Sequence, residues 1–184
     1  MTLLRTTLVL IAFFPGLAQA ADLLKASDVT NFVTAYEKME ALQSKYPDVE
    51  TNLDATADFS KAMEMIDRMI DGGKLNFLGV AMEEAMRHPQ MSADLRGAVT
   101  SSGFASVDQF SDVGNRIIAA YMRSEMSGSD LREMQMMGDL PESQLAMIPA
   151  PMRKMAQYGP LLARALEKVP ADDVKLVKKM KPFG

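Results

Sequence analysis

The decapeptide MEEAMRHPQM, residues 82–91, surrounds the single histidine of the chain, His88, with three methionines. Thioether sulfurs are soft ligands that select Cu(I), and an imidazole nitrogen can complete such a site. Met86, His88 and Met91 are therefore a candidate Cu(I) or Ag(I) site. The competing interpretation is structural, because helical geometry puts Met86 in the middle of an apolar stripe and Pro89 favours an extended His88 at a helix end.

Paired carboxylates are the other groups that could do chemistry. A glycosidase needs two carboxylates that face one another across a cleft. Adjacent positions on a helix point about 100° apart, so neighbouring acids do not meet, whereas acids three residues apart can share a face. A carboxylate-based hydrolase remains a remote alternative. The pairs in question are Glu83 with Glu84, Asp172 with Asp173, and Glu64 with Asp67.

Most catalytic constellations are missing from the sequence. The chain has no cysteine, so it has no thiol nucleophile, thiolate metal site or redox pair. A single histidine excludes an HExxH motif and a zinc site of several histidines. There is no P-loop, GxGxxG motif or GxSxG elbow. We therefore expect a protein that is not an enzyme and has no resident cofactor.

Four of the 17 methionines do not fit the apolar stripe of their predicted helix. Methionine is a flexible core filler, and its adaptable side chain also suits surfaces that bind varied apolar partners. These side chains either widen the buried face of a helix or line an exposed apolar groove. In the second case they predict a binding surface for a protein partner. The four residues are Met65, Met122, Met126 and Met136.

The stretch VKLVKKMKPFG near the end of the sequence is basic. Lysines at the C-terminal end of a helix complement the helix dipole, which is a structural role. The same charges can also make weak contact with an anionic surface such as lipid headgroups. The lysines concerned are Lys175, Lys178, Lys179 and Lys181.

The elements that must position these residues are helices nearly throughout. Apolar residues recur at steps of three and four, and no segment shows the strict alternation of a strand, so no sheet is expected. Gly159-Pro160 should kink or split the helix that contains it. The predicted fold is all-α: one irregular bundle of about seven to nine helices, several of them short and punctuated by proline and glycine. The expected helices cover about 27–46, 59–70, 75–87, 92–102, 106–122, 129–138, 141–148, 151–169 and 170–181.

The segment GFASVDQFSDVGNRIIAAYM, residues 103–122, resembles part of small secreted helical proteins of Gram-negative bacteria that have no assigned function. The resemblance covers about a tenth of the chain and contains no catalytic signature. It implies a helical exported protein, and no functional residue is carried over from it.

Residues 1–20 have the pattern of a cleaved signal peptide. Arg5 provides the positive charge, and the apolar run over 8–14 is shorter than the roughly 18 residues of a spanning helix. Ala18-Gln19-Ala20 is a signal-peptidase pattern, which would leave one helical domain over 21–184. We therefore expect a periplasmic or secreted protein rather than an integral membrane protein.

The formal net charge of −4 gives the chain no general electrostatic reason to bind nucleic acid. The leading hypothesis is an exported, non-enzymatic helical protein that acts through a methionine-rich apolar surface on a protein or envelope partner, as a chaperone-like or envelope-associated factor. The alternative is a periplasmic soft-metal binding protein that uses Met86, His88 and Met91 for Cu(I) or Ag(I).

Overall fold

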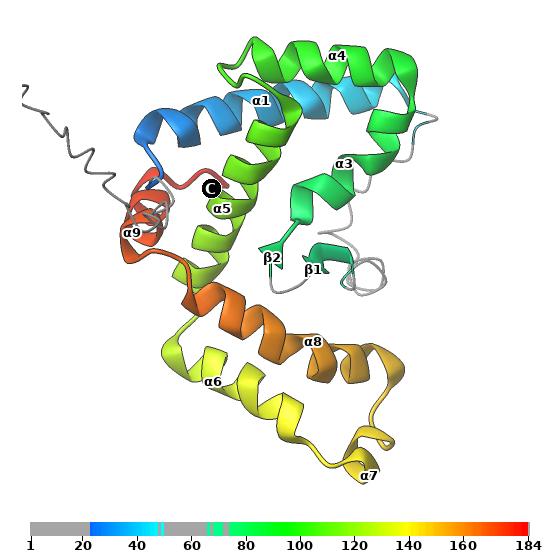
Figure 1. Ribbon diagram of the computed structural model, residues 1–184, viewed down its shortest axis with the longest axis vertical. Helices are drawn as coiled ribbons and strands as arrows, with labels where there is room; N and C mark the ends of the chain where they lie inside the picture. The colour runs from blue at the N-terminus through cyan, green and yellow to red at the C-terminus, as the bar shows by residue number, and fades with distance from the viewer. Residues whose placement is uncertain (1–22, 48, 50–65, 67, 72–73, 184) are drawn as a thin grey trace, which may run out of the picture.

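The computed structural model describes residues 23–47, 49, 66, 68–71 and 74–183, and within these ranges the fold is all-α as predicted. They contain eight α-helices and one short 3-10 helix (Figure 1). The elements are α1 (Ala26–Lys45), β1 (Ile70–Asp71), β2 (Lys74–Leu75), α3 (Phe77–Arg87), α4 (Pro89–Thr100), α5 (Val107–Glu125), α6 (Gly128–Met136), η2 (Met137–Asp139), α7 (Glu142–Leu145), α8 (Ala150–Glu167) and α9 (Ala171–Met180).

Helix α5 is the central element of the fold. It packs against α1, α3, α4 and α9, and it also contacts α8. Helices α6 and α8 pack on each other with η2 between them, and in Figure 1 they form a layer below the other helices. We call residues 128–167, which include α6, η2, α7 and α8, the arm. Helix α8 thus joins the arm to the rest of the protein, through its contacts with α5, β1 and β2.

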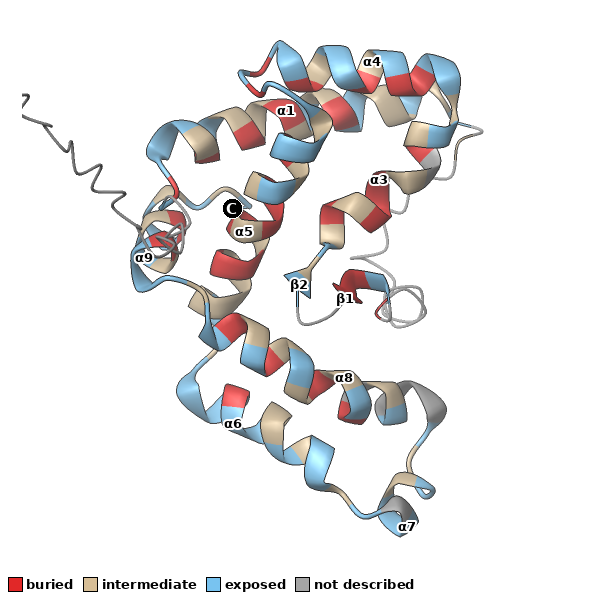
Figure 2. Cartoon of the chain, viewed as in Figure 1, coloured by how far each residue is buried: buried red, intermediate tan, exposed pale blue. Residues whose placement is uncertain are grey.

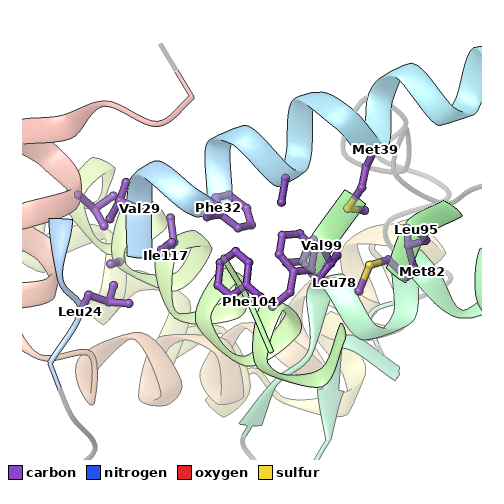
Figure 3. Close-up of a cluster of buried hydrophobic side chains, with 14 residues drawn as sticks. Leu24, Val29, Phe32, Met39, Leu78, Met82, Leu95, Val99, Phe104 and Ile117 are labelled. Carbon is purple, nitrogen blue, oxygen red and sulfur yellow. The ribbon is translucent and has the colours of Figure 1, made fainter. Parts of the chain in front are cut away.

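The main core lies between α1, α3, α4, α5 and α9 (Figure 3). The ring of Phe32 stacks on that of Phe110, with centroids 5.5 Å apart. Helix α1 contributes a stripe at steps of three and four, as its sequence predicts. Figure 2 shows these buried positions on the inward faces of the helices. The stripe consists of Val29, Phe32, Ala35 and Met39.

A second, smaller cluster of buried side chains joins the arm to α5. Its buried members are Ala119, Leu131, Ala163 and Leu166. Helix α8 runs continuously from Ala150 to Glu167 with Pro160 inside it, so Gly159-Pro160 does not split this helix, and the predicted kink stays a prediction.

The reason is packing between α6 and α8. A Cβ atom placed on Gly159 would lie 3.3 Å from the carbonyl oxygen of Met134, so the glycine lets the two helices approach closely. The ring of Pro160 lies against Gly138, where an added Cβ would come within 2.6 Å of Cγ. These contacts stabilise a helix whose local sequence favours a break.

The expectation of no sheet is also wrong, at one point. Ile70 pairs with Leu75 and Asp71 pairs with Lys74 in a minimal antiparallel ladder. Gly-Gly between two short segments is a hairpin signal, and the expectation of no sheet overlooked it. Most of the predicted helix over 59–70 lies outside the described residues, as do Gly72-Gly73 themselves.

Ser106 caps the start of α5. Ser106 Oγ accepts a hydrogen bond from the backbone N–H of Gln109 at 3.1 Å. Gln109 Oε1 in turn accepts from the N–H of Ala105 at 2.7 Å, one residue before the N-cap. Within the described parts of the chain, no helix combines the length and apolar character that crossing a membrane requires.

Candidate functional site

Most of the large apolar side chains that are exposed belong to the arm. Across the residues that the structure describes, five such side chains are exposed, and three of them belong to the arm. Met136 at the end of α6 is 62% exposed, and Met147 after α7 is 85% exposed. The third, Leu161, lies on α8 beside Pro160, whose ring contacts Gly138. The other two are Leu23 and Phe183.

Met136 lies in an open concavity of about 820 Å³ on α6 and η2. Residues 129, 132, 133 and 136 follow one another at steps of three and one, so they occupy one face of α6. Met136 is the one apolar residue among those that line this concavity. The lining residues are Ser129, Arg132, Glu133, Gln135, Met136 and Asp139.

The first turn of α6 is held by a reciprocal cap between Ser127 and Asp130. Asp130 Oδ2 accepts from the N–H of Ser127 at 2.6 Å, and Ser127 Oγ accepts from the N–H of Asp130 at 3.2 Å. The hydrogen bond from the Ser127 backbone lowers the pKa of the Asp130 carboxyl below its usual value. Asp130 is therefore ionised at neutral pH, and its cap sets the first residue of α6, the helix that carries Met136.

The segment 128–145, which carries this face, is acidic. It has four carboxylates and one guanidinium. A partner that covers Met136 should therefore carry positive charge around an apolar centre. The charged residues are Asp130, Glu133, Asp139 and Glu142 against Arg132.

The structure describes three of the four predicted surface methionines, and it does not bring these three together on one open surface. Met122 and Met126 are partly buried and pack against the smaller cluster between α5 and the arm. Met65 lies outside the described residues, and among the three described members only Met136 is exposed. Sequence reasoning missed Met147, because it follows a four-residue helix where no apolar stripe can be measured.

His88 is extended, as Pro89 predicts, with φ −86° and ψ 114°. Its Nδ1 accepts a hydrogen bond from the N–H of Met91 at 3.3 Å, so the imidazole caps α4. The side chain of Met91 is 1% exposed, and the sulfur of Met86 lies 3.8 Å from Ser92 Oγ. These contacts assign structural roles to the three residues, and the soft-metal site stays a prediction.

The ring of His88 also lies against Tyr46, with centroids 5.5 Å apart. Tyr46 donates its hydroxyl proton to Asp94 at 2.8 Å, and Lys45 Nζ lies 2.5 Å from the same carboxylate oxygen. The hydrogen bond from Lys45 lowers the pKa of Asp94, and the hydrogen bond to Asp94 raises the pKa of Tyr46. Asp94 thus pairs with Lys45 and Tyr46 rather than orienting His88, so this cluster joins α1 to α4 and does not form a catalytic triad.

The carboxylates have structural partners. Asp173 is 1% exposed and accepts from the Leu24 N–H at 2.8 Å and from Arg116 Nη2 at 2.9 Å. Its neighbour Asp172 is exposed and pairs with Lys175 at 3.2 Å.

Of the other acidic pairs, the structure describes the side chain of Glu83 alone. Glu83 pairs with Arg68 and Arg87. Glu64 and Asp67 lie outside the described residues. Across the described parts of the chain, no three histidine, aspartate or glutamate side chains form a group that could hold a metal ion.

The basic residues of α9 lie where the sequence places them. Lys178 and Lys179 are exposed in the last turn, next to the negative end of the helix dipole. Lys181 ends the helix in the left-handed conformation, with φ 49°. This arrangement satisfies the structural interpretation, and contact with an anionic surface stays a prediction.

Comparison with known proteins adds no relative. No protein-family model matches the chain, and no curated protein or solved structure is significantly similar to it. The functional argument therefore rests on the residues of the chain itself.

Proposed function

We propose that this protein is an exported, non-enzymatic helical protein that binds an apolar, basic segment of a partner protein through the arm. The exposed methionines Met136 and Met147 carry the proposal. Thioether side chains adapt their shape to different apolar partners at low cost. Exposed apolar side chains mark a protein interface where they form one patch, so the proposal requires that a single partner covers both Met136 and Met147.

Charge supports a protein segment over a lipid surface as the partner. The acidic segment 128–145 around Met136 would be repelled by anionic headgroups, which attract lysine and arginine. The exposed lysines Lys178 and Lys179 belong to α9, outside the arm. Apart from Arg132, the basic residues of the arm, Arg153, Lys154 and Arg164, belong to α8 and not to the segment that carries Met136. An amphipathic helix with apolar and basic residues complements both the methionines and the carboxylates.

Export is the second part of the proposal. It rests on the signal-peptide pattern of residues 1–20. N-terminal sequencing of the protein recovered from the periplasm of a Gram-negative host should begin at Ala21. Recovery of the uncleaved chain from the cytoplasm would contradict export and leave the binding proposal untouched.

The binding test uses a labelled synthetic amphipathic peptide of leucine and lysine, with fluorescence anisotropy as the readout. The double variant Met136→Ser/Met147→Ser should weaken binding by about tenfold or more, because each buried contact residue contributes on the order of 1 kcal/mol. The control variant Gln144→Ser/Gln157→Ser changes exposed polar positions of the arm and should leave the affinity unchanged.

Two results would contradict this function. The first combines two measurements: the folded protein binds a hydrophobic dye no better than ordinary globular proteins do, and both double variants bind the peptide with equal affinity. The second is methionine-dependent binding to anionic lipid vesicles in place of the peptide, which would make the partner an envelope surface.

A further inference from the structure

A half-open cavity lies between α1 and the residues that follow α9. The backbone N–H of Lys181 donates to the carbonyl of Val177 at 2.9 Å, and the left-handed conformation of Lys181 turns the chain. Pro182 and Phe183 then fold back over α1 and α5, where Figure 1 marks the C-terminal end. A side wall of the cavity is thus made by the last residues that the structure describes.

Aromatic rings line this region. The Phe183 ring meets that of Tyr121 on α5 edge to face, with centroids 5.0 Å apart. It also meets the Phe32 ring of α1 at 6.0 Å, and Phe32 in turn lies 6.0 Å from Tyr36. Phe183 is nevertheless 40% exposed. Part of its ring surface is therefore accessible to a ligand.

The cavity has a volume of about 290 Å³. Phe32 is 1% exposed, so the rings that a ligand can reach are those of Tyr36 and Phe183, beside two carboxylates. Glu37 and Glu40 lie three residues apart on α1, so they share a face, and both are exposed. Among the residues that the structure describes, neither carboxylate has a cation within ion-pair distance. The lining residues are Phe32, Val33, Tyr36, Glu37, Glu40, Pro182 and Phe183.

We propose that this cavity binds a small organic ammonium ion of the alkylammonium or quaternary ammonium class. The negative faces of aromatic rings attract such a cation, and its alkyl groups match the apolar walls. Glu37 and Glu40 add attraction at the rim and would repel an anion. A neutral apolar ligand would make no charge interaction with Glu37 and Glu40. We therefore expect the cavity to prefer a cation over a neutral ligand of the same shape. This site is separate from the arm and does not depend on its function.

The probes are choline and tetramethylammonium, titrated into the full protein and followed by amide chemical shifts in NMR spectra. The matched control ligand is the carbon analogue of choline, in which a tert-butyl group replaces the trimethylammonium group. The ammonium ions should saturate in the millimolar range and shift the amides of residues 33–40 and Phe183. The carbon analogue should bind at least about tenfold more weakly, which corresponds to about 1.4 kcal/mol.

Three variants locate the site. Glu37→Gln/Glu40→Gln should raise the Kd for choline about tenfold, because it removes both rim charges. Phe183→Leu keeps apolar contact but removes the ring, and should raise the Kd several-fold. Glu167→Gln, an exposed change at the end of α8, should leave the Kd unchanged.

The proposal is overturned by any of three outcomes. One is the absence of saturable shifts with either ammonium ion. Another is equal affinity for the carbon analogue, which would show a merely apolar cavity. The last is choline binding that is the same in Glu37→Gln/Glu40→Gln, Phe183→Leu and Glu167→Gln, which would place the ligand elsewhere.

Discussion

At the scale of single residues, Asp173 connects three distant parts of the chain. Its carboxylate accepts from the backbone of Leu24, ahead of α1, and from Arg116 on α5, while Asp173 itself belongs to α9. A buried carboxylate is costly unless it is paired and hydrogen-bonded, and both oxygens of Asp173 have a donor. Removing this side chain would therefore leave a buried N–H and a guanidinium without their acceptor.

We expect Asp173→Ala to lower the free energy of unfolding by about 2–4 kcal/mol. Asp173→Asn should cost less, because its amide oxygen can still accept from Leu24. Urea denaturation followed by circular dichroism measures both. The adjacent variant Asp172→Asn alters an exposed ion pair and should stay within about 0.5 kcal/mol of the parent protein. Equal effects at the two positions would contradict the role of Asp173.

The contacts of His88 lead to an expectation for the soft-metal hypothesis. Its Nδ1 caps α4 and the side chain of Met91 is buried, so Ag(I) would have to break existing contacts to gather these ligands. In calorimetric titrations we expect only weak Ag(I) binding, equal in the parent protein, His88→Ala and Met86→Leu/Met91→Leu. Tight stoichiometric binding that these variants abolish would instead make metal handling the working function.

At the scale of elements, two helical glycines have opposite surroundings. A Cβ on Gly114 of α5 would lie 2.2 Å from Leu78 Cδ1 and 2.6 Å from Phe32 Cε2, so the glycine permits close packing with α1 and α3. A Cβ on Gly97 of α4 would meet nothing within 4 Å. The same substitution should therefore change stability in opposite directions at the two positions.

We expect Gly114→Ala to lower the free energy of unfolding by about 1–3 kcal/mol, because the overpacking outweighs the helix propensity of alanine. Gly97→Ala should raise it by about 0.5–1 kcal/mol through propensity alone. Thermal denaturation of both variants supplies the comparison. A stabilised Gly114→Ala variant would mean that α5 can move away from α1 and α3 at little cost.

At the scale of the whole molecule, local sequence patterns predicted the helices, whereas long-range contacts determine how the helices pack and which side chains are buried. The Ser106 cap and the stripe of α1 depend on residues a few positions apart, which the sequence displays directly. The N-terminus of α3 is different, because the Leu78 N–H donates to Asn115 on α5 at 2.9 Å instead of to its own N-cap residue, Asn76. No local sequence pattern predicts a hydrogen bond between residues 37 positions apart.

The same distinction applies to the candidate site. Met136 was recognisable because it departs from the stripe of its own helix. Met122 and Met126 also depart from the apolar stripe of their helix, yet both pack against the smaller cluster. Their burial is determined only by the packing of α5 with the arm. The aromatic cavity was not foreseen, since Phe32 and Phe183 meet only when the chain after α9 folds back.

The hydrogen bond between Leu24 and Asp173 also constrains the order of folding, since it joins residues 149 positions apart. The main core contains Leu24 and Val177, so it closes only after α9 has left the ribosome. Contacts of this sequence separation form late, because loop closure must precede them. During most of its synthesis the chain therefore lacks its final core, which would keep it extensible enough to thread through a secretion channel before it folds.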